Sequence, residues 1–477
     1  MTPLGGSASL PLPVGSLENA SAKPEHRLAE GCALGLALAS AGSWFRVLVE
    51  HTPRIDTGTW PFVAASALAG LGLLLAGLCA LRLAPRAAQL SWRTLWGYAL
   101  LVQFVAYLAA ALTSSDVFTN LALGALARSG LSPYAHAPSE LGPSPWVALV
   151  PPRWVHDPTP YGPLFHPFAL AAVWLGEALG SPLWGAFYAF KALLLSALVA
   201  ALALAARHLR RRASPAQAAE TFTWLALGPL LAWEISGQGH NDGLLFLSLV
   251  AFWTAAASGR SALAASALAA GVAVKYALAP LLVLFLLFLA RRSLARAATA
   301  AFIAACVLLG AFAPERAALT LRAVTPMVGG EAARHAHSLT DLVCLVLDHL
   351  ELPAASALAY RLLAAGSALL CLSLLARTAW RSRTLEELAH GYLTFLMGLY
   401  LTAPWFQPWY VAWALPLLLV EPDPRYRRLL VLFSFVTVVQ WIAPLDPVTT
   451  VAGDGWAAWQ LWRLARERPG AAPLPAI

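Results

Sequence analysis

The chain has 477 residues, of which 59% are apolar and only 12% are charged, and its formal net charge is +8. An average soluble domain has about 25% charged residues, so this chain has too few charges to cover a soluble globule of its size. The composition excludes a disordered protein, a disulfide scaffold and a nucleic-acid binder, and it predicts a polytopic membrane protein. The five cysteines stand alone and predict neither a disulfide framework nor a metal site.

Residues 1–28 are rich in Pro, Ser and Gly and predict a flexible cytoplasmic tail. A membrane-spanning helix needs about 20 mostly apolar residues. The windows that meet this length are 30–49, 61–82, 93–113, 184–206, 219–236, 240–257, 261–290, 296–313, 354–376, 389–420 and 427–446. The window 261–290 is interrupted at Lys275 and Pro280, and 389–420 is interrupted between Pro404 and Pro408, so each predicts two short helices. The total is about 11–13 transmembrane helices.

Arginine-rich loops alternate with loops poor in basic residues, and short basic loops face the cytoplasm. This alternation places a long first loop, 114–183, and a second, 314–353, on the extracytoplasmic side. It predicts a bundle over 29–446 and an extracytoplasmic C-terminal tail over 447–477. Within the first loop, the apolar stretch 166–180 predicts a short surface or re-entrant helix.

Polar residues that do not belong in lipid gather at the predicted outer face. Asp116 follows a membrane helix, and it is either an interfacial helix cap or a general base. The second interpretation has a chemical basis, because a sugar hydroxyl is a poor nucleophile until a carboxylate takes its proton.

Three cations, Lys191, Lys275 and Arg361, are predicted within the outer leaflet. An ammonium at such a depth costs a few kcal/mol unless it is paired or reaches the headgroups. Each of the three either extends separately to the headgroups or contributes to one site for an anion, for which a lipid phosphate is the natural candidate.

Two further groups lie at the same face. His240, Asn241 and Asp242 either cap the following helix or form part of a sugar site or order the base. Gln407, Trp409 and Tyr410 belong to a dense aromatic cluster that begins at Trp405. That cluster is either part of an interfacial belt or a surface on which sugar rings stack.

Several short motifs occur in one order along most of the chain. They are Ser115-Asp116, Gly130–Tyr134 (GLSPY), Thr159–Leu164 (TPYGPL), Gly239–Gly243 (GHNDG), Val274-Lys275 and Pro408–Pro416 (PWYVAWALP). Through them the chain resembles the GT-C superfamily of integral-membrane glycosyltransferases. Among these it is most similar to the polyprenol-phosphate-mannose-dependent α-(1→6)-mannosyltransferases of actinobacteria.

This resemblance implies an all-α GT-C helical bundle in the bacterial cytoplasmic membrane, with its active site on the extracytoplasmic side. It implies inverting transfer of a sugar, here mannose, without a metal or another cofactor. The donor is a polyprenyl-phosphate sugar, the acceptor is lipid-linked or a glycan, and membrane lipids surround the protein. Asp116 matches the acidic residue of the family's first outer loop and is the expected general base.

We therefore expect Lys275 to hold the donor phosphate, with help from Lys191 or Arg361. The side chains expected to shape the sugar and acceptor site are Tyr134, Tyr161, His240, Asn241, Asp242, Gln407, Trp409 and Tyr410. The alternative function is a membrane transporter or a flippase for lipid-linked sugars, which also needs charges within the membrane. That class predicts inverted repeats and charges near the midplane, whereas this chain has no evident repeat and its charges cluster near one face.

Overall fold

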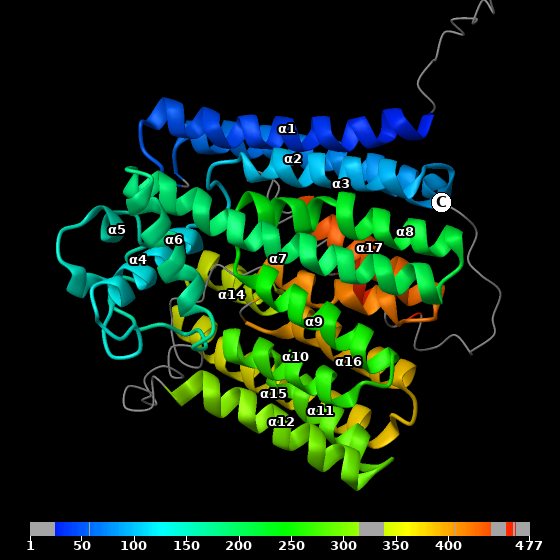
Figure 1. The fold of residues 1–477 in the computed structure, drawn as a ribbon. Helices are drawn as coiled ribbons and strands as arrows, with labels where there is room; N and C mark the ends of the chain where they lie inside the picture. Colours follow the sequence, from blue (N-terminus) through cyan, green and yellow to red (C-terminus); the bar gives the residue numbers. More distant parts are fainter. Residues whose placement is uncertain are drawn as a thin grey trace, which may run out of the picture.

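Long runs of Ala and Leu, bounded by Pro, Ser and Gly, give the chain an all-helical architecture (Figure 1). The computed structural model describes residues 24–56, 58–313, 338–404, 406–439, 455–460 and 463. Within these ranges every regular element is a helix, so the predicted all-α fold is confirmed. Most of the two predicted tails, residues 314–337 of the second outer loop and Trp405 lie outside the described residues.

Five helices in the described part are long and apolar enough to cross a membrane. They are α1 (Pro24–Glu50), α2 (Trp60–Leu83, continued by the short helix η1, Ala84–Gln89), α7 (Pro182–Arg212), α12 (Leu294–Phe312) and α15 (Pro353–Arg381). At 1.5 Å per residue, about 20 residues match the hydrocarbon thickness. The long helices therefore make the chain a multi-pass membrane protein, and the outward leucines of α15 stay exposed because their solvent is lipid.

Shorter helices complete the bundle and connect the long ones. In chain order they are α3 (Trp92–Tyr107), α4 (Asp116–Arg128), η2 (Pro138–Leu141), α5 (Pro145–Ala148), α6 (His166–Ala178), α8 (Pro215–Leu227), η3 (Leu231–Gly237), α9 (Asp242–Ala257), α10 (Ser261–Val274), η4 (Tyr276–Leu278), α11 (Ala279–Ala290), α14 (Leu339–His349), α16 (Leu385–Thr402), η8 (Pro408–Trp413), η9 (Leu415–Leu419) and α17 (Pro424–Val439).

Both predicted interruptions are present, and proline causes them. Pro280 has no N–H to bond back to the carbonyl of Tyr276, and α10 ends at Val274 with Lys275 in an extended conformation. Pro404 disfavours helical angles at the preceding residue, and Ala403 is extended where α16 ends. Each break leaves a polar segment inside the bundle.

The segment 114–183, which the sequence predicts as a loop, contains several ordered helices. The expected short helix at 166–180 is present as α6, whose 13 residues are too few to cross a membrane. A second helix of the same length, α4, begins at Asp116 and packs beside α6. The two helices meet at Gly124, where an added Cβ would lie 2.5 Å from the carbonyl oxygen of Ala169.

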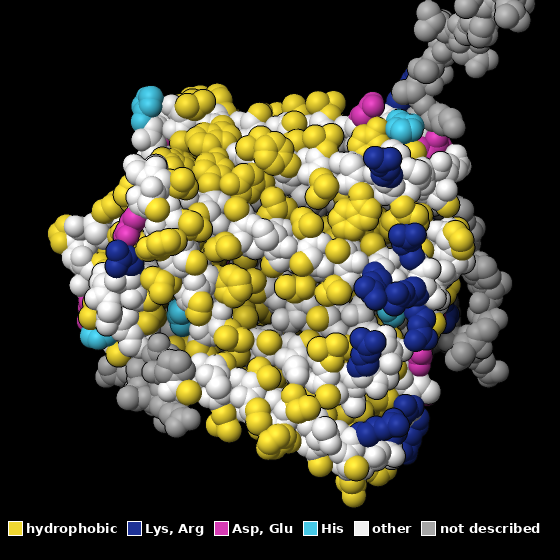
Figure 2. Space-filling view, in the orientation of Figure 1, with side chains coloured by type: hydrophobic (Ala, Val, Ile, Leu, Met, Phe, Trp, Pro, Cys, Tyr) yellow, Lys and Arg dark blue, Asp and Glu magenta, His cyan; other side chains and the backbone are white. Residues whose placement is uncertain are grey.

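The two ends of the bundle differ in charge. Figure 2 shows Lys and Arg gathered at one end of an otherwise apolar face, the end at which α7 finishes with Arg210, Arg211 and Arg212. The helices α4, α5 and α6 lie at the opposite end (Figure 1). The predicted site residue Asp116, which begins α4, therefore lies at the end of the bundle opposite to the arginine cluster.

Candidate active site

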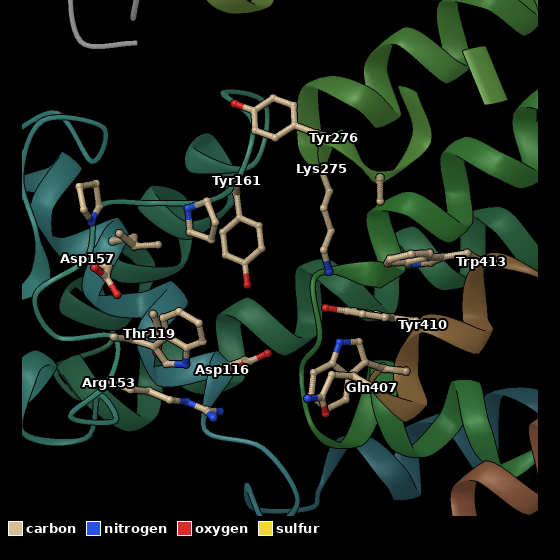
Figure 3. Close-up of a pocket in the computed structure, with 16 residues that line it drawn as sticks. Asp116, Thr119, Arg153, Asp157, Tyr161, Lys275, Tyr276, Gln407, Tyr410 and Trp413 are labelled. Atoms are coloured by element: carbon tan, nitrogen blue, oxygen red, sulfur yellow. The ribbon is translucent and has the colours of Figure 1, made fainter. Parts of the chain in front are cut away.

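A cavity of about 420 Å³ lies where α4, the rest of the segment 114–183 and the two helix breaks meet (Figure 3). Its walls come from segments far apart in the sequence. The residues that line it are Asp116, Thr119, Leu123, Arg153, Trp154, Asp157, Pro158, Pro160, Tyr161, Lys275, Tyr276, Ala277, Gln407, Trp409, Tyr410 and Trp413. Most of these side chains are apolar or aromatic, and the charged ones are Asp116, Arg153, Asp157 and Lys275.

Asp116 is the first residue of α4, and its backbone N–H donates to Ser114 Oγ at 3.1 Å. The carboxylate points into the cavity, towards the side of Lys275 and Tyr410 (Figure 3). Its side chain is 26% exposed. Burial raises the pKa of Asp116 above its ordinary value, while the positive charges of Lys275 and Arg153 oppose this shift.

The backbone just before Asp116 is unwound, because α3 ends at Tyr107 and α4 begins only at Asp116. Irregular backbone inside a membrane protein needs partners for its polar groups. Lys191 supplies two of them, since its Nζ donates to the carbonyl oxygens of Tyr107 at 2.6 Å and Ala109 at 2.5 Å. Lys191 is fully buried and does not line the cavity.

Three more side chains hold the same segment. Gln238 Oε1 accepts from the N–H groups of Leu112 at 2.7 Å and Thr113 at 3.0 Å. Arg46 donates to the carbonyl oxygen of Ala111 at 3.0 Å, and Ser43 Oγ accepts from the N–H of Ala110 at 2.9 Å. The position of Asp116 is thus fixed by contacts from α1, α7 and the turn after η3.

Lys275 extends from the break between α10 and α11 into the cavity, where its side chain is 10% exposed. Its Nζ lies 3.0 Å and 3.2 Å from the two carboxylate oxygens of Asp242. Trp413 Nε1 donates to the same carboxylate at 2.6 Å. The ammonium also lies 4.9 Å from the ring of Tyr410 and 5.8 Å from that of Tyr161, distances at which aromatic faces attract cations.

The two Pro-Tyr motifs of the segment 114–183 contact each other and the break at Lys275. Tyr134 Oη donates to the carbonyl oxygen of Tyr161 at 2.8 Å, so Tyr134 supports the cavity wall from behind. The N–H of Gly162 donates to the carbonyl oxygen of Val274 at 2.9 Å. A Cβ at Gly162 would lie 2.2 Å from the carbonyl oxygen of Ala273, so only glycine permits this approach.

The phenol of Tyr161 points into the cavity (Figure 3). Burial raises the pKa of Tyr161, and the nearby negative charges of Asp116 and Asp242 raise it further. The hydroxyl therefore keeps its proton at neutral pH, and it also contacts the side chain of Asn241.

His240, Asn241 and Asp242 lie behind the cavity wall, and none of them lines the cavity. The ring of His240 stacks on that of Trp409, with centroids 3.7 Å apart, and its Nδ1 lies 3.6 Å from Asp116 Oδ2. Asn241 precedes α9 but its side chain makes no capping hydrogen bond. These three residues contact the side chains that face the cavity.

The structure places Gln407, Trp409 and Tyr410 in the cavity wall. Arg361 is exposed on α15 and does not line the cavity. Sequence reasoning missed Arg153 and Trp413. Trp413 lies four residues after Trp409 in the same motif. Arg153 is one of two arginines, with Arg128, in a segment poor in basic residues, so the sequence contained a signal for both missed residues.

Groups of three or more His, Cys, Asp or Glu side chains able to hold a metal ion are absent from the described ranges. A family model of the N-terminal domain of alpha-(1->6)-mannopyranosyltransferases, the MptA/B family, matches residues 29–292, which is more than half of the chain. This match contains Asp116, Tyr161 and Lys275 and ends before Gln407. A search of curated proteins finds no match to the sequence.

Proposed function

Because the chain belongs to the family of alpha-(1->6)-mannopyranosyltransferases, we propose that this cavity transfers mannose from a polyprenyl-phosphate carrier to a hydroxyl group of a lipid-linked or glycan acceptor. The single observation that carries the proposal is the arrangement of Asp116 and Lys275. A carboxylate at the start of α4 and a buried ammonium from the break between α10 and α11 extend into one cavity (Figure 3).

The chemical step is a single displacement with inversion. Asp116 takes the proton of the acceptor hydroxyl as that oxygen bonds to the anomeric carbon of the donor. The bond between the anomeric carbon and the phosphate oxygen breaks, and its electron pair leaves with the lipid phosphate. The phosphate gains one negative charge, so cations placed beforehand lower the barrier.

Two cations of the cavity meet this need. Lys275 shares its charge with Asp242 but is surrounded by rings rather than water, which strengthens its attraction for an incoming phosphate. Arg153 lines the same cavity from the first outer loop, and its guanidinium points inward (Figure 3). We assign the donor phosphate to these two residues, since Lys191 and Arg361 lie away from the cavity.

The sugar ring would pack against the aromatic wall. Tyr161, Trp409 and Tyr410 offer faces for apolar C–H groups, and Gln407 adds an amide that both donates and accepts hydrogen bonds. His240 and Asp242 contribute indirectly, by fixing Trp409, Asp116 and Lys275.

The basic end of the bundle indicates the orientation of the protein. Short loops rich in Arg face the cytoplasm, and the C-terminal arginines of α7 lie at that end. The cavity then opens on the extracytoplasmic side, and a polyprenyl-phosphate donor reaches it from the outer leaflet.

The test is transfer of radiolabelled mannose from polyprenyl-phosphate mannose by the purified protein in lipid vesicles. Asp116→Asn keeps the shape but removes the base, and it should lower kcat by at least about 100-fold. Asp157→Asn is the matched control, because Asp157 lines the same cavity and carries no assigned step. Full activity of Asp116→Asn, or no transfer by the unmodified protein from this donor, would contradict the proposal.

A further inference from the structure

Behind Asp116 lies a second buried carboxylate that the proposed reaction does not use. Glu234 is fully buried in η3, a π-helical turn that ends at Gly237. Turns of this kind inside membrane and soluble helices occur frequently at functional sites. Its Oε2 lies 3.4 Å from Nε2 of His240.

The imidazole of His240 therefore lies between two carboxylates. Its Nε2 faces Glu234 and its Nδ1 faces Asp116 Oδ2 at 3.6 Å. The ring is 1% exposed and is held flat against Trp409, with an angle of 18° between the ring planes. The carboxylate of Asp116 faces the cavity, whereas that of Glu234 is buried inside the bundle.

We propose that Glu234 and His240 are positioning residues for Asp116, with a hydrogen on Nδ1 that faces the Asp116 carboxylate and with Glu234 holding the ring from the other side. This inference rests on the proposed role of Asp116 as the base.

The assignment of the hydrogen follows from the chemistry of imidazole. A bare Nδ1 would set its lone pair against the carboxylate of Asp116, so Nδ1 carries a hydrogen. The contact between Nε2 and Glu234 then holds one further proton, either on the imidazole or on the carboxyl group. In both cases Asp116, His240 and Glu234 together carry one negative charge, and Asp116 keeps its other oxygen for the substrate.

The consequence is electrostatic as well as geometric. A donor on Nδ1 stabilises the charged form of Asp116 and works against burial, which favours the neutral form. The other groups that act on this carboxylate are Lys275, Arg153, Asp242 and Ser114, and Lys275 also acts on the imidazole. Loss of Glu234 leaves these four in place, so its effect can be separated from theirs.

Glu234→Met tests the inference, because it removes a buried carboxyl group and keeps the length of the side chain. Removing one partner of a buried charged pair is strongly destabilising, so thermal unfolding of the variant is measured first and kcat is expressed per folded protein. In metal sites, loss of the group that hydrogen-bonds the far side of a metal-bound histidine lowers metal affinity or activity about 10- to 100-fold. We expect kcat to fall on the order of tenfold, the donor KM to stay unchanged, and the acid inflection of kcat to move to higher pH.

The chain offers a matched control at its basic end. Glu421 is also buried, and its Oε2 lies 3.5 Å from Nδ1 of His390, away from the cavity. Glu421→Met should leave the pH inflection of kcat where it is. In a His240→Ala background, Glu234→Met should cause no further loss, because Glu234 acts through the imidazole.

A second measurement does not depend on transfer. Carbodiimides react with protonated carboxyl groups in apolar surroundings, and the pH dependence of labelling at Asp116, read by peptide mass spectrometry, should move to higher pH in Glu234→Met. Unchanged kcat and labelling, or activity that falls only with the amount of folded protein, would overturn the inference. If the unmodified protein transfers no mannose yet the labelling moves as expected, the proposed function fails and the positioning role stands.

Discussion

Lys191→Met distinguishes two roles for this buried cation, binding of the donor phosphate and support of the unwound backbone before Asp116, between which the sequence alone does not decide. In the structure the ammonium bonds two carbonyl groups of the unwound segment before Asp116. Methionine has nearly the same length but donates no hydrogen bond, so the carbonyls of Tyr107 and Ala109 lose this partner inside the bundle.

The expected magnitude follows from these two contacts. A buried carbonyl left without a donor costs about 1–3 kcal/mol, and two of them cost about 2–6 kcal/mol. Removal of a buried ammonium offsets part of this cost, so the protein should still fold, with a lower melting temperature. The larger effect should fall on Asp116, because a displacement of about 1 Å at a reacting group lowers the rate about 100-fold.

The assay is steady-state mannose transfer at varied donor concentration, with Lys275→Met measured in parallel. Lys191→Met should lower kcat about 100-fold and leave the donor KM within a factor of about two. Lys275→Met should raise the donor KM, because it removes a phosphate ligand. A raised donor KM with a normal kcat in Lys191→Met would refute this reasoning and would indicate that Lys191 binds the donor phosphate.

Three further predictions concern the cavity. Burial raises the pKa of Asp116 in the unliganded protein, and the base acts only when deprotonated, so kcat/KM measured across pH 4–9 should be lost on acidification with its inflection above the usual value of about 4. A low-pH limit at or below that value would contradict the assignment. Gly162→Ala should abolish transfer because its Cβ would meet the backbone of Ala273. Gly97→Ala, with open space around it, should stay active and stable in the same assay and in thermal unfolding. Arg153→Ala should weaken donor binding about tenfold and Arg153→Lys less, as measured by donor KM; equal loss in both would argue against a charge role.

The breaks in the bundle were predictable because their causes are local. Proline and a lone lysine in apolar runs mark the ends of α10 and α16 wherever the rest of the chain lies. The short helix α6 was predictable for a similar reason, since its apolar run is too short to span a membrane.

The partners of the buried charges were not predictable in the same way. Lys191 and Lys275 look alike in sequence, yet one bonds an unwound backbone and the other a carboxylate. That difference depends on which segment unwinds and which helix packs against it, and hydropathy records neither. Glu234 gave no separate signal, because a single acidic residue within a predicted spanning helix shows no partner until the turn after it is folded.

The cavity wall contributed by η8 has a consequence for biogenesis. Asp116 is inserted into the membrane early, whereas Trp409 and Trp413 emerge from the ribosome only after most of the helices are in place. A nascent chain therefore contains the Asp116 carboxylate long before the aromatic wall of the cavity has been made. The cavity is complete only when η8 packs beside the earlier helices.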